Sequence, residues 1–97
     1  MYEIKQTSIF NKWYSKQELT VRIIIDARFK RVKELGGLGS VRCLGSKLFE
    51  FKWNVGIRIY FIIKDDKRVI ILLNGGNKNG QKRDIQKARK LQKDYGV

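Results

Sequence analysis

The residues of this chain whose types could do chemistry are cations and aromatic side chains. The 97 residues include 22 Lys and Arg, no His and one Cys, so a Ser/His or Cys/His nucleophile system is excluded. The only adjacent carboxylates, Asp65 and Asp66, stand in a predicted turn, where aspartates usually bond their own backbone. The glycine-rich segment from Gly36 to Ser40 lacks the Gly-Lys-Ser/Thr ending of a phosphate-binding loop. We therefore expect neither a metal site nor a cofactor.

The segment from Gly56 to Phe61 places a cation beside a phenol. Because side chains alternate faces along a strand, Arg58 and Tyr60 would share one face, away from the better-packed side. Lysine and arginine hold phosphates, and tyrosine and tryptophan offer faces on which bases stack, so this set suits RNA. It could also cleave RNA without a metal, with the 2′-hydroxyl of the RNA as nucleophile and arginine stabilising charge on the phosphate. Proton transfer is harder to assign, because unperturbed lysine and tyrosine titrate near about 10.

The composition predicts a single basic domain covering residues 1–97. Hydrophobic residues make up 42% of the chain, enough for one modest core. A net charge of +13 attracts polyanions, which are nucleic acid, an anionic membrane surface or an acidic protein. The lone Cys43 is expected to be a small buried hydrophobe, and it cannot form a disulfide within the chain. The sequence also shows no leader and no membrane-spanning run. These features favour a cytoplasmic location.

Hydrophobic periodicity predicts an α+β arrangement that positions these residues. The expected strands are a short one at Tyr2–Lys5 and three in succession at Leu48–Trp53, Ile57–Lys64 and Arg68–Asn74. The expected helices are Ser8–Ser15, a second from Gln17 or Glu18 to the glycines at Gly36, and a last one from Gln81. The second helix would bury a stripe made mostly of Leu19, Ile23, Ile24, Ala27 and Val32. Gly36–Gly45 is expected to be irregular, and Gly75–Gly80 to be a polar turn.

Taken in order, these elements and three local motifs resemble the RelE/ParE superfamily of bacterial toxins, in particular HigB-like addiction module killer proteins. The motifs are GLGSVR at Gly37–Arg42, GIRIYF at Gly56–Phe61 and LLNGGNK at Leu72–Lys78, followed by Gln81 and Asp84-Ile85. The resemblance covers nearly the whole chain. It implies a RelE-like fold, in which an N-terminal strand and a helical hairpin pack on a small antiparallel sheet with a C-terminal helix.

The resemblance also implies a function. It implies a toxin of a type II toxin-antitoxin system that cuts mRNA in the ribosomal A site without a metal and so inhibits translation. The implied partners are mRNA on the ribosome and a cognate antitoxin, a HigA-like helix-turn-helix protein.

The site residues are carried over from the resemblance position by position. Arg58 would stabilise the scissile phosphate, and Lys52 would transfer a proton or orient the 2′-hydroxyl. Lys78 matches the basic residue after the last strand and completes the catalytic set. Contacts to RNA are expected from Arg42, Tyr60, Gln81 and Arg83. Some relatives place a His or Tyr near the C-terminus as proton donor, and no matching residue is found here. Tyr60 or Asp84 could serve, although Asp84 is equally a charge that complements a helix N-terminus.

Two other functions remain open. A ParE-like protein would poison DNA gyrase without cleaving nucleic acid, but such proteins usually lack the basic cluster formed by Arg42, Lys52, Arg58 and Lys78. A non-enzymatic RNA- or ribosome-binding module, or a degenerate toxin, would bind in a salt-sensitive manner without cleavage.

Overall fold

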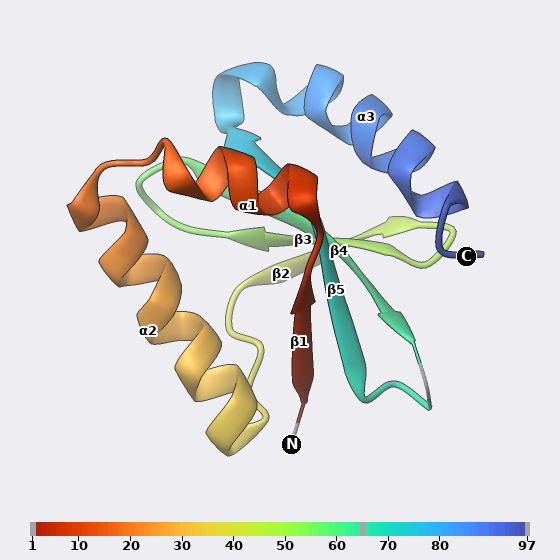
Figure 1. Cartoon of the computed structure of the whole chain (residues 1–97), viewed down its shortest axis with the longest axis horizontal. Coiled ribbons are helices and arrows are strands. Elements are labelled where there is room, and N and C mark those ends of the chain that lie inside the picture. The colour runs from red at the N-terminus through yellow and green to blue at the C-terminus, as the bar shows by residue number, and fades with distance from the viewer. Residues whose placement is uncertain (1, 65, 97) are drawn as a thin grey trace.

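The computed structural model describes residues 2–64 and 66–96 and has an α+β fold, with three α-helices and a five-stranded mixed sheet (Figure 1). The elements are β1 (Glu3–Gln6), α1 (Ser8–Ser15), α2 (Leu19–Leu35), β2 (Val41–Gly45), β3 (Leu48–Lys52), β4 (Ile57–Lys64), β5 (Val69–Asn77), the 3-10 helix η1 (Lys78–Gly80) and α3 (Gln81–Lys93). The strand order is β1-β5-β4-β3-β2, in which β1 runs parallel to β5 and all other neighbours are antiparallel. No helix among the described residues is long and apolar enough to cross a membrane.

The helices begin and end where the local sequence requires. Thr7 caps α1, because its hydroxyl accepts a hydrogen bond from the Phe10 amide and donates to the Leu72 carbonyl of β5. The second helix ends at Gly36, whose φ of 78° lies in the left-handed region that glycine tolerates. The predicted bounds Ser8–Ser15, the end of the second helix and the start of the third at Gln81 are therefore confirmed.

The two faces of the sheet carry separate cores. α1 and α2 pack on one face over a cluster of Phe, Trp, Ile, Leu and Val side chains, and α3 covers part of the opposite face (Figure 1). Buried residues of the first cluster include Phe10, Ile25, Phe29, Phe51, Trp53, Ile59 and Phe61. Those of the second are Leu48, Tyr60, Ile62, Val69, Ile71, Leu73 and Ala88. Because α3 covers this second face only in part, polar side chains on the same strands can lie beside its first turn.

Two predicted segments prove to be more regular than expected. The segment Gly36–Gly45 contains β2, which pairs with β3 at the edge of the sheet and places Arg42 opposite Glu50. β5 continues through Asn77 before η1 begins, so the predicted turn at Gly75–Gly80 is wrong in its first half. Gly75 and Gly76 pair with Ile59 and Arg58 of β4, and the side chains of Trp13 and Asp84 occupy the space that a Cβ would take at these two positions. The predicted turn at Asp65 lies partly outside the described residues.

Two burial predictions also need correction. α2 buries Ile25, Phe29 and Val32, whereas Leu19 and Ile23 are 63% and 56% exposed, because the helix turns a different stripe toward the sheet. Cys43 is exposed, since it lies on the edge strand β2.

A β-bulge in β5 shapes the face under α3. Tyr60 pairs with Asn74 and Phe61 pairs with Leu72, so Leu73 is an extra residue in β5. A bulge of this kind re-aims the side chains that follow it. Leu73 and Asn74 consequently both lie on the α3 side of the sheet, and Asn74 comes next to Tyr60.

Candidate functional site

Two rows of polar side chains cross the α3 side of the sheet. Strand register aligns the first row across four strands, and its members are Arg42, Glu50, Tyr60 and Asn74. The second row, one pleat nearer the β3–β4 turn, consists of Lys52, Arg58 and Gly76. Opposed residues in neighbouring strands have Cβ atoms about 5 Å apart. The register therefore brings Lys52 and Arg58, both expected from the sequence, side by side.

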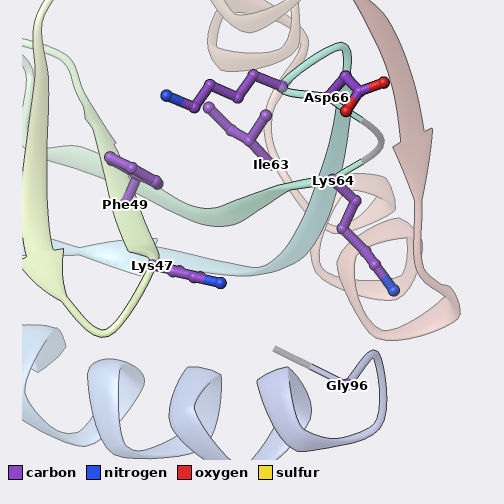
Figure 2. A pocket seen from close by; sticks show the side chains of 7 residues that line it. Lys47, Phe49, Ile63, Lys64, Asp66 and Gly96 are labelled. Carbon is purple, nitrogen blue, oxygen red and sulfur yellow. The ribbon is translucent and has the colours of Figure 1, made fainter.

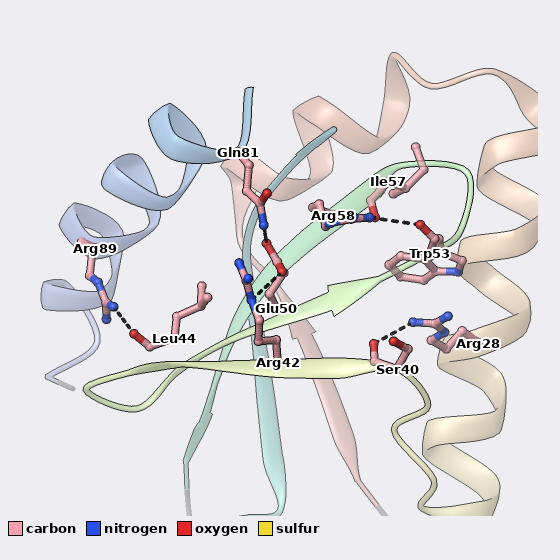
Figure 3. A network of polar contacts seen from close by, with 10 residues as sticks. All are labelled: Arg28, Ser40, Arg42, Leu44, Glu50, Trp53, Ile57, Arg58, Gln81 and Arg89. Atoms are coloured by element: carbon pink, nitrogen blue, oxygen red, sulfur yellow. Dashed lines mark hydrogen bonds and ion pairs between the residues drawn. The ribbon is translucent and has the colours of Figure 1, made fainter. Parts of the chain in front are cut away.

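Glu50 is the centre of the first row (Figure 3). It is fully buried; one carboxylate oxygen accepts a hydrogen bond from Gln81 Nε2 at 2.6 Å, and the other lies 3.4 Å from Arg42 Nε. A buried charge is tolerated only when it is paired and hydrogen-bonded. Glu50 thus holds together two of the predicted RNA-binding residues, Arg42 from β2 and Gln81 from α3.

Arg58 in the second row is fixed by backbone carbonyls. Its Nη1 donates to the carbonyl oxygens of Trp53 and Ile57 at 3.0 and 2.9 Å, which holds the guanidinium against the β3–β4 turn (Figure 3). Lys78 reaches the same turn, since its amide donates to the Gly56 carbonyl and its side-chain carbons lie over Gly56. Lys52, Arg58 and Lys78, the predicted catalytic set, are therefore close neighbours.

The first turn of α3 closes the site against β5. Asn74 Nδ2 donates to the Asp84 carbonyl at 3.0 Å. The Asp84 carboxylate rests on Gly76, where an added Cβ would lie only 1.9 Å from its Oδ2. Gly76 is the cross-strand neighbour of Arg58, so this carboxylate lies one strand from Arg58 and two strands from Lys52.

Unsatisfied polar atoms concentrate in these rows. Five buried side-chain nitrogen or oxygen atoms of the described residues have no hydrogen-bond partner, and four belong to Glu50, Arg58, Tyr60 and Asn74. The large majority of buried polar atoms in proteins do find a partner, so each exception needs an explanation. A cluster of exceptions is typical of a site that binds or transforms a polar ligand.

Burial also shifts the pKa values of Tyr60, which lies under α3, and of Asp84, which lies in the first turn of α3. It raises the pKa of Tyr60 strongly, with further contributions from the charges of Glu50 and Asp84, while Arg58 acts in the opposite direction. The Tyr60 hydroxyl lies beside the Glu50 carboxylate, whose charge and capacity to accept a hydrogen bond add to this shift, but the two groups are not at regular hydrogen-bond geometry. Burial raises the pKa of Asp84 as well, and Arg83 and Lys87 oppose that shift.

Two predicted RNA contacts have opposite surroundings, one of them buried and one exposed. Tyr60 is 0% exposed, because α3 covers it, so the expectation that its ring offers an open face for stacking is wrong in this structure. Arg83 lies on the exposed side of α3 and lines a separate shallow hollow with Lys82 and Gln86. The sequence reasoning overlooked Glu50, although its position in the alternating segment Leu48–Lys52 puts it on the same face as Lys52.

Another hollow lies at the opposite end of the sheet (Figure 2). It forms between the β2–β3 and β4–β5 connections, where Phe49 and Ile63 provide an apolar floor and Lys47 and Lys64 lie at its sides. None of the residues that line it belongs to the two polar rows. Among the described residues, no three His, Cys, Asp or Glu side chains gather closely enough to hold a metal ion.

Comparison with solved structures identifies the fold. An Escherichia coli RelE double mutant in the free state superposes with a TM-score of 0.73 over 92% of this chain and 95% of that chain, at 20% sequence identity. A chain of the E. coli RelBE toxin-antitoxin complex superposes with a TM-score of 0.66. The match covers 79% of this chain and 96% of that chain, also at 20% sequence identity. A chain of the RelB-RelE complex of Methanococcus jannaschii superposes with a TM-score of 0.67. The match covers 81% of this chain and 95% of that chain, at 11% sequence identity. The chain therefore has the RelE fold, and the resemblance to the RelE/ParE superfamily is confirmed at the level of the fold.

Sequence comparison then identifies the family. An uncharacterized protein of Haemophilus influenzae is 33% identical over 97 residues, which cover 98% of this chain and 97% of the relative. The chain belongs to the same family as this protein. No model of a known protein family matches the sequence.

Proposed function

We propose that this protein is the toxin of a type II toxin-antitoxin system and belongs to the HigB-like branch of the RelE/ParE superfamily. In this proposal it is a metal-independent endoribonuclease that cuts mRNA on the translating ribosome and so inhibits translation. The observation that carries the proposal is the pairing of Lys52 with Arg58, beside Lys78, on the partly covered sheet face of a RelE fold.

The chemistry of these groups supports RNA cleavage. Arg58 is held by two carbonyls through Nη1, so its guanidinium is oriented before substrate arrives. Preorganised donors of this kind stabilise charge that develops on a phosphate in the transition state. Lys52 and Lys78 would add positive charge around the same phosphate, and Arg42 and Gln81 would contact the neighbouring nucleotides. The net charge of +13 favours association with a polyanion such as ribosome-bound mRNA.

The proposal includes an antitoxin partner. Several structures with the same fold are RelE chains in complex with RelB antitoxins. By analogy, a cognate antitoxin would neutralise this chain in the cytoplasm, and we propose a HigA-like helix-turn-helix protein for that role.

A translation reaction with purified protein tests the proposal. Primer extension along the mRNA should show discrete cuts that appear only when ribosomes are translating. Intact mRNA with uninterrupted translation would refute the proposal and favour a ParE-like gyrase poison, which a supercoiling assay would then detect. Intact mRNA with stalled ribosomes would instead favour a module that binds without chemistry.

A further inference from the structure

The Asp84 carboxylate occupies a defined place in the candidate site. It projects from the first turn of α3 onto the backbone of β5 at Gly76, and its Oδ2 fills the space where any other residue would carry a Cβ. Gly76 pairs with Arg58, and Arg58 pairs with Lys52. The Asp84 carboxylate, held by α3, therefore lies over β5, next to the strand that carries Arg58 and two strands from the one that carries Lys52, and neighbouring strands are about 4.8 Å apart.

This carboxylate has no structural partner among residues 2–64 and 66–96. It makes no ion pair with a cation and accepts no hydrogen bond, although α3 carries several lysines and arginines. The turn that leads into α3 is capped by Asn77, whose side chain accepts hydrogen bonds from the amides of Asn79 and Gly80. The N-cap of α3 itself is Gly80, and no hydrogen bond from the backbone amides of its first turn to the Asp84 carboxylate is found among the described residues.

The neighbouring titratable groups are poor proton acceptors. Tyr60 is fully buried, and burial raises its pKa strongly. Glu50 is also fully buried and already binds Gln81 and Arg42. A protonated lysine or arginine has no lone pair with which to accept a proton. The charged or titratable groups that interact with Asp84 are Arg83 and Lys87 on α3 and Tyr60 on β4, while Arg58 is the cross-strand neighbour of Gly76 beneath it.

We infer that Asp84 is the general base of the cleavage reaction. This inference rests on the proposed function, and it assigns the proton-transfer step to a partly exposed carboxylate that lies over Gly76, the cross-strand neighbour of Arg58. Burial raises the pKa of Asp84, which makes its carboxylate a stronger base than an ordinary aspartate, while Arg83 and Lys87 favour the ionised form.

The step balances without a metal or a co-reactant. The ionised Asp84 takes the proton of the 2′-hydroxyl as the 2′-oxygen bonds to phosphorus. The bond between phosphorus and the 5′-oxygen breaks, and the leaving oxygen takes a proton from water. The products are a 2′,3′-cyclic phosphate and a free 5′-hydroxyl, and the hydroxide left from water removes the proton from Asp84. Arg58 and Lys52 stabilise the negative charge on the phosphate during this exchange.

The test compares single-turnover mRNA cleavage on ribosomes by wild-type protein and by Asp84→Asn. Loss of a general base lowers a rate by about 10²–10⁴-fold, and we expect that loss at saturating protein with unchanged ribosome affinity. Asp94→Asn, at the exposed C-terminal end of the same helix, is the matched control and should cut at the wild-type rate. Asp84→Glu should recover part of the rate.

Chemical rescue separates catalysis from structure. Asp84→Ala leaves space above Gly76, so added formate or acetate should restore part of its cleavage rate, whereas chloride at equal ionic strength should not. If Asp84→Asn, folded by its thermal melt, cuts at the wild-type rate, the inference is wrong and the proposed function stands. The inference is equally wrong if the rate loss comes with an equal loss of ribosome affinity and no rescue. If wild-type protein leaves mRNA intact, the proposed function itself fails.

Discussion

Gly75 and Gly76 are adjacent in β5 and face opposite sides of the sheet, so the same substitution should have opposite consequences at the two positions. An added Cβ at Gly75 would lie 2.5–2.7 Å from three carbons of the Trp13 ring. At Gly76 it would lie 1.9 Å from Asp84 Oδ2. The first neighbour is an indole packed between α1 and the sheet, and the second is the free end of a short side chain.

The two costs follow from what each neighbour can do. An ordinary Cβ contact is at least 3.4 Å, so the Trp13 ring would have to retreat by about 3.4 − 2.5 = 0.9 Å, which lifts α1 from its core. Overpacking of this kind costs about 1–3 kcal/mol. In a domain of this size, each kcal/mol lowers Tm by about 4–8 °C. Gly76→Ala requires a larger shift, about 3.4 − 1.9 = 1.5 Å, but rotation of the Asp84 side chain can supply it at little cost in stability.

Thermal melts and ribosome-dependent cleavage should therefore separate the two variants. We expect Gly75→Ala to lose stability while its folded fraction still cleaves, and Gly76→Ala to melt near the wild-type temperature while cleavage falls by about 10²-fold or more. Gly37→Ala is the control, because nothing lies within 4 Å of an added Cβ there, and it should be neutral or gain about 0.4–1 kcal/mol. Wild-type cleavage by Gly76→Ala, with a crystal structure showing Asp84 displaced, would refute the reasoning.

Three further results are expected. Tyr60→Phe removes a buried hydroxyl that makes no hydrogen bond, so stability should be unchanged or rise by about 1 kcal/mol, and cleavage should persist; abolished cleavage would return proton transfer to Tyr60. Arg28→Lys should lower the free energy of unfolding by about 1–2 kcal/mol in denaturant titrations, because the guanidinium lies 4.0 Å from the Trp53 ring centroid and donates to the Lys52 carbonyl at 2.7 Å. Because the folded protein raises the pKa of Asp84 above its ordinary value of 3.8, its contribution to stability is greatest below that pH and is lost as pH rises through the raised pKa. Melts across this pH range should therefore show Asp84→Asn gaining stability relative to wild type as pH increases; a relative loss would indicate a helix-stabilising charge instead.

Local signals predicted most of the fold. The cap at Thr7, the left-handed glycine at Gly36 and the alternation from Ile57 to Lys64 each act over a few residues, and each element formed where its signal lies. The two strands that carry Lys52 and Arg58 and the tight turn between them were predicted as well, although the register that pairs these two residues was not.

The parts that could not be predicted depend on contacts between distant segments. β2 contains exposed residues and forms because β3 offers it an edge, which its own composition does not indicate. Tyr60 is buried because α3 returns over it about twenty residues later in the chain. The bulge that turns Asn74 toward α3, and the convergence of Arg42 and Gln81 on Glu50, likewise depend on tertiary packing and have no local signal.

The central claim is that Arg58, with Lys52 and Lys78 beside it, cleaves ribosome-bound mRNA. The most direct test measures the cleavage rates of the variants Arg58→Ala and Arg68→Ala. Arg68 is an exposed arginine in the β4–β5 connection, directly before β5 and away from both polar rows. We expect Arg58→Ala to lose about 10²–10³-fold in cleavage rate while still binding ribosomes, and Arg68→Ala to cut like wild type. Arg58→Lys keeps the positive charge but lacks the planar guanidinium, so its cleavage rate should lie between those of the two alanine variants. It also serves as a control for a folding defect in Arg58→Ala. Cleavage by folded Arg58→Ala at the wild-type rate would contradict the account.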